Sequence, residues 1–384
     1  MTSFVKDRSK SPLFISLFAI SSIVMFFPLF EGIEIYPYWV LLIFLVNWQF
    51  KKLSIYIYSA IFIFILAFLK GIMISSFYKD FLQFTAIGIA LYFFYQLNSS
   101  ERNLFRNIIR YAIYFQFLFI LFSYFDKDFQ HFFYEIFSNR GIDGLKALDR
   151  NGAFTGFSPE PSYGASLIIG LWILISSEED YFRKTKSGID LTIVFLSLLF
   201  FKSVYGFIIF SLVSFYFFCF REMNYINRTF FTITNVFAIF GSYIDLEFLR
   251  PSLQRTWIFY ESLINNFLTK QNSFENITSE TFPNIVLDAE RQASSNSTRF
   301  TAILNVLDFD KDSTYTKSIS APVFLINIFS FYFFFLVPIF IKLNSKNLKD
   351  VFKNSYLIVL AFFITPMLVW PYYTLFFKDE KNNY

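Results

Sequence analysis

Long apolar runs, separated by short polar segments, divide the chain along most of its length. Eleven of them approach the roughly 20 apolar residues that a helix needs to cross a bilayer core about 30 Å thick. They cover residues 13–30, 36–50, 53–69, 81–97, 108–125, 161–176, 189–201, 204–220, 229–244, 322–341 and 356–377. The pattern predicts an all-α, polytopic integral membrane protein with about 11 transmembrane helices, which form a single membrane domain over residues 1–384.

For two of these runs, the sequence allows two different connections. Runs 189–201 and 204–220 are separated only by Lys202 and Ser203. They predict either a helical hairpin with a tight turn or one long bent helix.

The distribution of Lys and Arg among the short loops predicts the orientation, because cytoplasmic loops carry an excess of these cations. With the N-terminus inside, the cytoplasmic segments hold seventeen Lys and Arg residues, whereas the short outer loops hold only Lys70, Lys79 and Lys202. We therefore expect an N-in, C-out topology. No small-residue cleavage site follows the first run, which should remain as an uncleaved anchor. Two long hydrophilic loops, residues 126–160 and 245–321, then fall on the same extracytoplasmic side.

Composition supports a membrane protein and excludes several other classes. Of the 384 residues, 55% are hydrophobic and 16% are charged, against roughly 25% charged in soluble domains. A single cysteine, Cys219, and a single histidine, His131, exclude a disulfide framework, a Cys/His zinc site and a Ser-His-Asp triad with a spare histidine. The net charge of +4 is small and scattered, so we expect no nucleic-acid partner.

The first long loop ends in a candidate anion site. Ser158 suits the N-cap and Pro159 the first turn of a helix that begins on the outside, so the positive end of the helix dipole faces outward. Arg150 lies upstream across two glycines and can fold back to the same place. This predicts a pocket for a phosphate-bearing substrate with the Glu160 carboxylate beside it. Alternatively, Glu160 only complements the dipole and Arg150 meets lipid phosphates.

The second long loop has two amphipathic stretches, residues 253–264 and 300–307, which predict helices that lie on the membrane or roof the site. Arg299 stands in the first turn of the second stretch, where a cation opposes the helix dipole unless an anion is near. This conflict favours a functional Arg299. The alternative is an ion pair with Glu290 or Asp288.

Three weaker motifs have plainer explanations. Residues 308–312 resemble the start of a calcium loop, but Ser313 and Ile319 replace the required Gly and Glu, so they predict a solvated acidic turn. The same acidic residues lie on the wrong side for a nucleotide-sugar transferase. His131 lies in an aromatic stretch that suits membrane anchoring, or else acts as a general base. Residues 202–206 add a cation and a hydroxyl to the outer pocket, or simply make a turn.

Taken together, these outer segments resemble the bacterial O-antigen polymerases of the Wzy type and, more distantly, the O-antigen ligases. The resemblance covers most of the chain in layout, and it is specific over residues 150–165, 201–206 and 297–299, in that order and on one side. Because the second large loop lacks a histidine, the sequence favours a polymerase over a ligase.

The resemblance implies a metal-independent glycosyltransferase at the outer face of the bacterial inner membrane, without a cofactor. A growing glycan leaves undecaprenyl diphosphate and joins a lipid-linked repeat unit, and a chain-length regulator and a flippase would be partners. Arg150 and Arg299 would bind the leaving diphosphate, and Glu160 would be the base or would orient the acceptor. Substrate-binding candidates are Tyr163, Lys202, Ser203 and Arg255.

Rival functions remain open at this point. An O-antigen ligase would transfer the glycan to lipid A core instead. A polysaccharide flippase or other transporter would need polar residues in the middle of its spans. A structural scaffold would tolerate neutralisation of Arg150 and Arg299.

Overall fold

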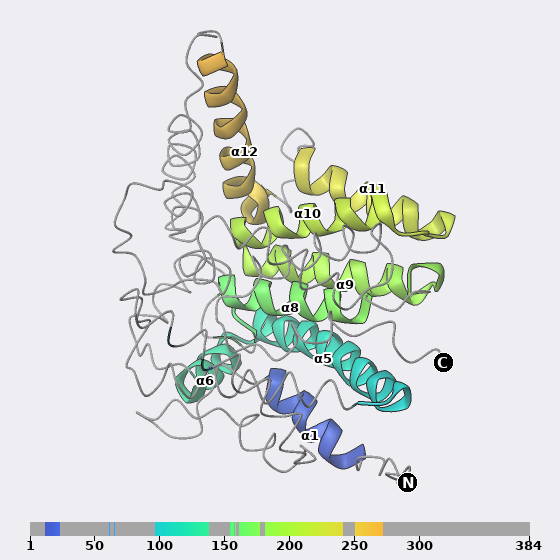
Figure 1. Ribbon diagram of the computed structural model, residues 1–384. Coiled ribbons are helices and arrows are strands. Elements are labelled where there is room, and N and C mark those ends of the chain that lie inside the picture. The colour runs from blue at the N-terminus through green and yellow to red at the C-terminus, as the bar shows by residue number, and fades with distance from the viewer. Residues whose placement is uncertain are drawn as a thin grey trace.

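The computed structural model of the protein describes residues 12–23, 61, 65, 97–137, 154–156, 158, 161–176, 181–240 and 250–271. Within these residues every regular element is helical and no strand occurs, so the all-α prediction is confirmed for this part of the chain (Figure 1). The elements are α1 (Pro12–Ile23), α5 (Ser99–Phe125), α6 (Lys127–Phe137), α8 (Pro161–Ser176), the 3₁₀ turn η1 (Tyr181–Arg183), α9 (Lys186–Phe201), α10 (Val204–Phe220), α11 (Tyr225–Phe240) and α12 (Arg250–Gln271).

Helices α5, α8, α9, α10 and α11 pack against one another in an up-and-down arrangement, with α1 on the outside of α5 (Figure 1). Each end of the bundle is named after one of its residues. The Ser203 end is where α5 and α9 end and where α8 and α10 begin. The Asp190 end is where α9 and α11 begin and where α10 ends. Helix α12 starts beside the first turns of α10 and projects steeply away from the bundle (Figure 1).

Aromatic side chains fill the space between the helices. Trp172 of α8 is fully buried. Its ring centroid lies 5.6 Å from that of Phe210 and 5.3 Å from that of Phe217, both on α10, and 5.9 Å from that of Phe231 on α11. These separations suit offset and edge-to-face contacts, which add to the area that the rings bury. Some of the chain's 61 phenylalanines therefore form the core that joins α8, α10 and α11.

The apolar runs predict several helix bounds well. Helices α8 and α10 match runs 161–176 and 204–220 residue for residue. Helix α5 begins earlier than run 108–125, at Ser99, because a polar capping box starts it. The Asn98 side chain accepts from the Glu101 N–H (2.9 Å), and the Glu101 carboxylate accepts from the Asn98 N–H (3.0 Å).

The eleven-span topology stays a prediction. Within the described residues, one helical segment, Ser100–Phe125, is long and apolar enough to cross a membrane by length and composition. The apolar segments Gly164–Ile173 and Gly206–Cys219 are shorter. Runs 322–341 and 356–377, as well as nearly all of runs 36–50, 53–69 and 81–97, lie outside the described residues.

Candidate functional site

The turn between α9 and α10 decides between the two connections that the sequence allows. Lys202 has φ 50° and ψ 34°, a left-handed conformation that ends α9, and its N–H donates to the Leu198 carbonyl (3.1 Å). Ser203 then caps α10, because its hydroxyl accepts from the Gly206 N–H (3.2 Å). The two helices therefore form a tight hairpin and not one long bent helix.

The segment that precedes α8 is attached to this hairpin. The Phe154 N–H donates to the Phe200 carbonyl (3.2 Å). The Tyr124 ring, at the end of α5, lies against both residues, with ring centroids 6.1 Å from Phe154 and 5.5 Å from Phe200. The Ser158 hydroxyl donates to the Thr155 carbonyl (2.6 Å). Two segments that are distant in the sequence thus meet at the Ser203 end.

Two glycines allow the backbones to come this close. A Cβ atom on Gly164 would lie 2.6 Å from the Phe201 ring and 2.7 Å from the Thr155 carbonyl oxygen. A Cβ atom on Gly206 would lie 2.6 Å from the Cβ of Ala165. All three distances are shorter than van der Waals contact, so larger residues at these positions would push α8 away from the hairpin.

Four of the predicted site residues belong to elements that meet at this end. Lys202 is half-buried and Ser203 is buried in the turn. Tyr163 belongs to the first turn of α8, and Arg255 belongs to the first half of α12. The buried Phe259 of α12 packs with Val204 and Ile208 of α10, which holds α12 beside the hairpin.

The remaining predictions for this site have different outcomes. The Ser158 hydroxyl donates to the Thr155 carbonyl, and the two residues that follow it lie outside the described residues, so its role as a helix N-cap stays a prediction. Pro159, Glu160, Arg150 and Arg299 lie outside the described residues, as do residues 300–307 and 308–312. His131 is partly exposed on α6, which packs on α5 through Phe129 and Phe133.

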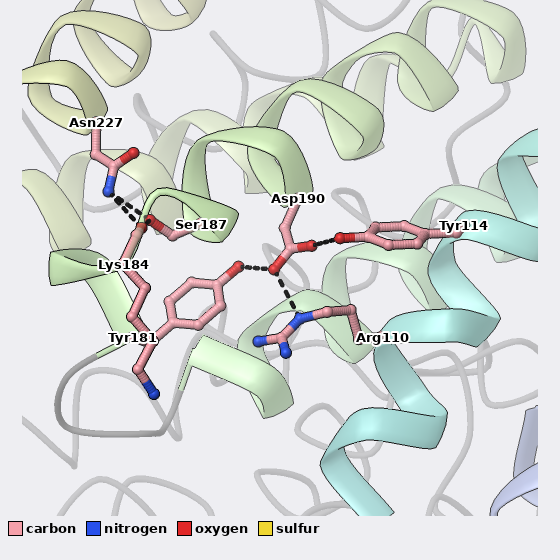
Figure 2. Close-up of polar contacts among 7 residues, drawn as sticks. All are labelled: Arg110, Tyr114, Tyr181, Lys184, Ser187, Asp190 and Asn227. Carbon is pink, nitrogen blue, oxygen red and sulfur yellow. Dashed lines mark hydrogen bonds and ion pairs between the residues drawn. The ribbon is translucent and has the colours of Figure 1, made fainter.

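The Asp190 end contains a second polar site, which the sequence analysis missed. Asp190 is fully buried on the second turn of α9, and its carboxylate binds three side chains (Figure 2). Oδ1 accepts from the Tyr114 hydroxyl (2.5 Å). Oδ2 accepts from the Tyr181 hydroxyl (2.7 Å) and from Arg110 Nε (3.2 Å). A charge buried this deeply persists only when it is paired and hydrogen-bonded, and this network satisfies both conditions.

Tyr181 joins the network in two ways. Its ring lies under the Arg110 guanidinium, whose central carbon is 5.8 Å from the ring centroid. Burial, and then the nearby Asp190 charge, raise the pKa of the Tyr181 hydroxyl well above its ordinary value. Tyr181 therefore remains protonated and donates to Asp190 at any ordinary pH.

The loop that precedes α9 is fixed from α11 (Figure 2). The Asn227 side-chain nitrogen donates to the carbonyls of Phe182 (2.7 Å) and Lys184 (2.9 Å) and to the Ser187 hydroxyl (2.6 Å). Asn227 is fully buried, so these bonds form away from water. The backbone around Lys184 is thus held in one conformation.

A cavity of about 550 Å³ opens beside this network. Four of its lining residues are cations, and no carboxylate occurs among the lining residues that the structure describes. The lining comprises Asn103, Arg106, Asn107, Arg110, Lys184, Thr185 and Lys186. The described part of the chain contains no cluster of three or more His, Cys, Asp or Glu that could hold a metal ion.

From the sequence, the Lys and Arg residues of this end served only to predict the orientation, and Asp190 belonged to no recognised motif. The overlooked signal is that Asp190 and Arg110 both fall inside apolar runs, where ionisable residues usually have a function and a partner.

Comparisons of the chain with protein-family models, with curated proteins and with solved structures find no match.

Proposed function

We propose that this chain is an O-antigen or surface-polysaccharide polymerase of the bacterial inner membrane, with its active site at the Ser203 end. The observation that carries the proposal is that parts of two of the three motif segments, residues 150–165 and 201–206, lie against each other. They are joined by two close glycine contacts and by the backbone hydrogen bond from Phe154 to Phe200, the residue before the second segment. Motifs that are far apart in the sequence belong to one site only if the fold brings them together, and this junction meets that condition for two of the three.

Exposed apolar side chains support the membrane part of the proposal. Tyr111, Phe115, Leu118 and Phe122 follow one face of α5 at helical spacing, and between 49% and 69% of each side chain is exposed. A contiguous apolar face of this kind is costly in water and favourable in lipid. Together with the eleven apolar runs, it supports a polytopic arrangement. The Lys and Arg residues of the short loops support the N-in, C-out orientation, in which the Ser203 end faces outward.

The proposed reaction uses groups at that end. The bond between the anomeric carbon of the growing glycan and the oxygen of undecaprenyl diphosphate breaks, and the electron pair leaves with the diphosphate. An acceptor hydroxyl on the lipid-linked repeat unit forms the new bond and gives its proton to a base, for which Glu160, the residue before α8, is the candidate.

Cations stabilise the charge that develops on the leaving diphosphate. Lys202 contributes one from the hairpin turn, and Arg150 and Arg299 are proposed to provide guanidinium groups that bind phosphate oxygens in pairs. The donor is already activated as a diphosphate ester, so the proposal includes neither a metal nor a cofactor.

Deletion of the gene tests the proposal in a host that makes lipopolysaccharide. A missing polymerase should leave lipid A core with a single repeat unit, because a separate ligase still transfers one unit. Gel analysis of the lipopolysaccharide distinguishes this from bare core with accumulated lipid-linked polymer, which would identify a ligase and refute the proposal.

A further inference from the structure

Gln116 is a fully buried polar side chain in the middle of α5, within the helical segment that is long and apolar enough to cross a membrane. It faces the motif segment that leads into α8. A Cβ atom on Gly156 would lie 2.4 Å from Gln116 Nε2 and 2.9 Å from Gln116 Cδ, so the amide lies directly against the Gly156 backbone. We infer that Gln116 is a positioning residue of the proposed active site, where it fixes the turn at Gly156.

The turn at Gly156 depends on glycine and on this contact. Gly156 has φ +57°, a left-handed conformation that glycine adopts without strain and that other residues disfavour. Any larger residue would also collide with the Gln116 amide. Because glycine is free to adopt many other conformations, a neighbouring group has to select this one. The three atoms that lie nearest to a Cβ at this position all belong to Gln116, which identifies that group.

The depth of the contact explains why an amide stands at position 116, where an apolar side chain would be cheaper to bury. Gln116 lies nine residues before the end of α5, which is about 14 Å along the helix axis. The non-helical segment at Gly156 is therefore buried alongside α5 and not beyond its end, and Thr155 and Ser158 are buried with it. Irregular backbone at membrane depth persists only where protein groups surround it, and Gln116 supplies such a group.

The inference rests on the proposed function, because it gives Gln116 a role in that active site. Gly156 comes six residues after Arg150 and four residues before Glu160, the candidate base. The turn thus sets the direction in which the chain continues toward both residues. Displacement of a catalytic group by about 1 Å can lower the rate about a hundredfold. Since Gln116 is fully buried, it acts through the turn and not on the substrate itself.

Kinetics of the purified full-length protein test the inference. Polymerisation of undecaprenyl-diphosphate-linked repeat units is measured in lipid, together with thermal unfolding. Gln116→Leu keeps the approximate size of the side chain and removes its amide, so the variant should unfold at an unchanged or higher temperature. It should lower kcat about tenfold and leave KM for the lipid-linked substrate nearly unchanged, because the groups that bind the substrate remain. A purely structural Gln116 would leave kcat unchanged in a variant that is equally stable.

Two further variants assign the effect to the contact with Gly156. The matched control Asn235→Leu removes an amide on α11 whose described hydrogen bond goes to the Phe231 carbonyl of the same helix (2.7 Å), and it should keep the kcat of the unmodified protein. Gly156→Ala introduces the collision with Gln116 and should lower kcat further. In the double variant with Gln116→Leu, the loss should fall short of the product of the single losses, because both changes disturb one contact.

The outcomes separate this inference from the proposed function. If the unmodified protein makes polymer and Gln116→Leu has an equal kcat, the inference is refuted and the proposed function stands. The same conclusion follows if Asn235→Leu loses as much kcat as Gln116→Leu, or if the losses of Gln116→Leu and Gly156→Ala multiply. If the unmodified protein makes no polymer, the proposed function fails and the inference fails with it.

Discussion

The two ends of the helix bundle are held together by different means. At the Ser203 end, backbone contacts connect α8 and the segment before it to the α9–α10 hairpin. They are the Phe154–Phe200 hydrogen bond, the left-handed turn at Lys202 and the close glycine contacts. At the Asp190 end, side chains connect α5, η1 and α9, because Arg110, Tyr114 and Tyr181 all donate to the buried Asp190 carboxylate. The two polar residues of the turn take part in it directly, because Lys202 ends α9 and Ser203 caps α10. At the Asp190 end, the same network that fastens α5 to α9 also orients a cation of the cavity.

The largest expected effect is the loss of Asp190. Asp190→Ala leaves the Arg110 charge and two tyrosine hydroxyls without their acceptor, which should destabilise the protein by about 3–5 kcal/mol. Thermal unfolding of the purified protein measures this change. The double change Arg110→Met, Asp190→Leu removes both charges and should be less destabilised than Asp190→Ala.

The exposed ion pair between Arg183 and Glu222 provides the control for that experiment. Glu222→Ala should leave the unfolding temperature nearly unchanged, because solvent already screens this pair. If Asp190→Ala unfolds at the same temperature as Glu222→Ala, the buried network does not hold the Asp190 end together.

The next largest effect is expected for Gly206→Ala, which tests the backbone contacts at the Ser203 end. Gly206→Ala brings a methyl group against Ala165 and should cost about 1–3 kcal/mol of unfolding free energy, as overpacking usually does. Because the obstacle is the Cβ of Ala165, the exchange Gly206→Ala with Ala165→Gly should recover most of that loss in the same unfolding measurement. An exchange as unstable as Gly206→Ala alone would mean that α8 and the hairpin are not in contact there.

The smallest effect on stability is expected for Lys202→Gly, which distinguishes a structural role of Lys202 in the turn from a role in catalysis. Glycine adopts the left-handed conformation without strain, so Lys202→Gly should stabilise the hairpin by up to about 1 kcal/mol. The same change removes a cation from the proposed active site and should lower the turnover of purified enzyme by about tenfold. A variant that is both more stable and fully active would assign Lys202 to the turn alone.

The sequence predicts the helices of this chain better than it predicts the contacts among them. Apolar runs give the bounds of α8 and α10, because burial of apolar residues ends where the polar turns begin. They miss the first turns of α5, which are polar and are started by Asn98 and Glu101. The hairpin at Lys202 was only one of two alternatives, because the sequence of the turn does not by itself reveal that a lysine adopts the left-handed conformation that glycine prefers.

The Ser203 end and the Asp190 network also differ in how well the sequence predicts them. The motif at residues 150–165 and the turn at residues 202–206 were singled out from the sequence, because caps, glycines and charges are local signals. The Asp190 network was not, since Tyr114 and Asp190 are far apart in the sequence and only the packing of α5 on α9 makes them partners. The same apolar runs that indicate spans also contain this charged pair, and its position inside them was the available signal.

The most direct test of the central claim, that the Ser203 end carries the chemistry, is polymerisation by the purified protein. In lipid, with undecaprenyl-diphosphate-linked repeat units and excess EDTA, the account predicts a ladder of glycan lengths on a gel. Arg150→Ala and Arg299→Ala, at normal protein levels, should each lower turnover by about ten- to a hundredfold, with only partial rescue by Lys at either position. The control Arg228→Gln, at the other end, should give the ladder of the unmodified protein. Absence of any ladder, or a normal ladder from both arginine variants, would contradict the account.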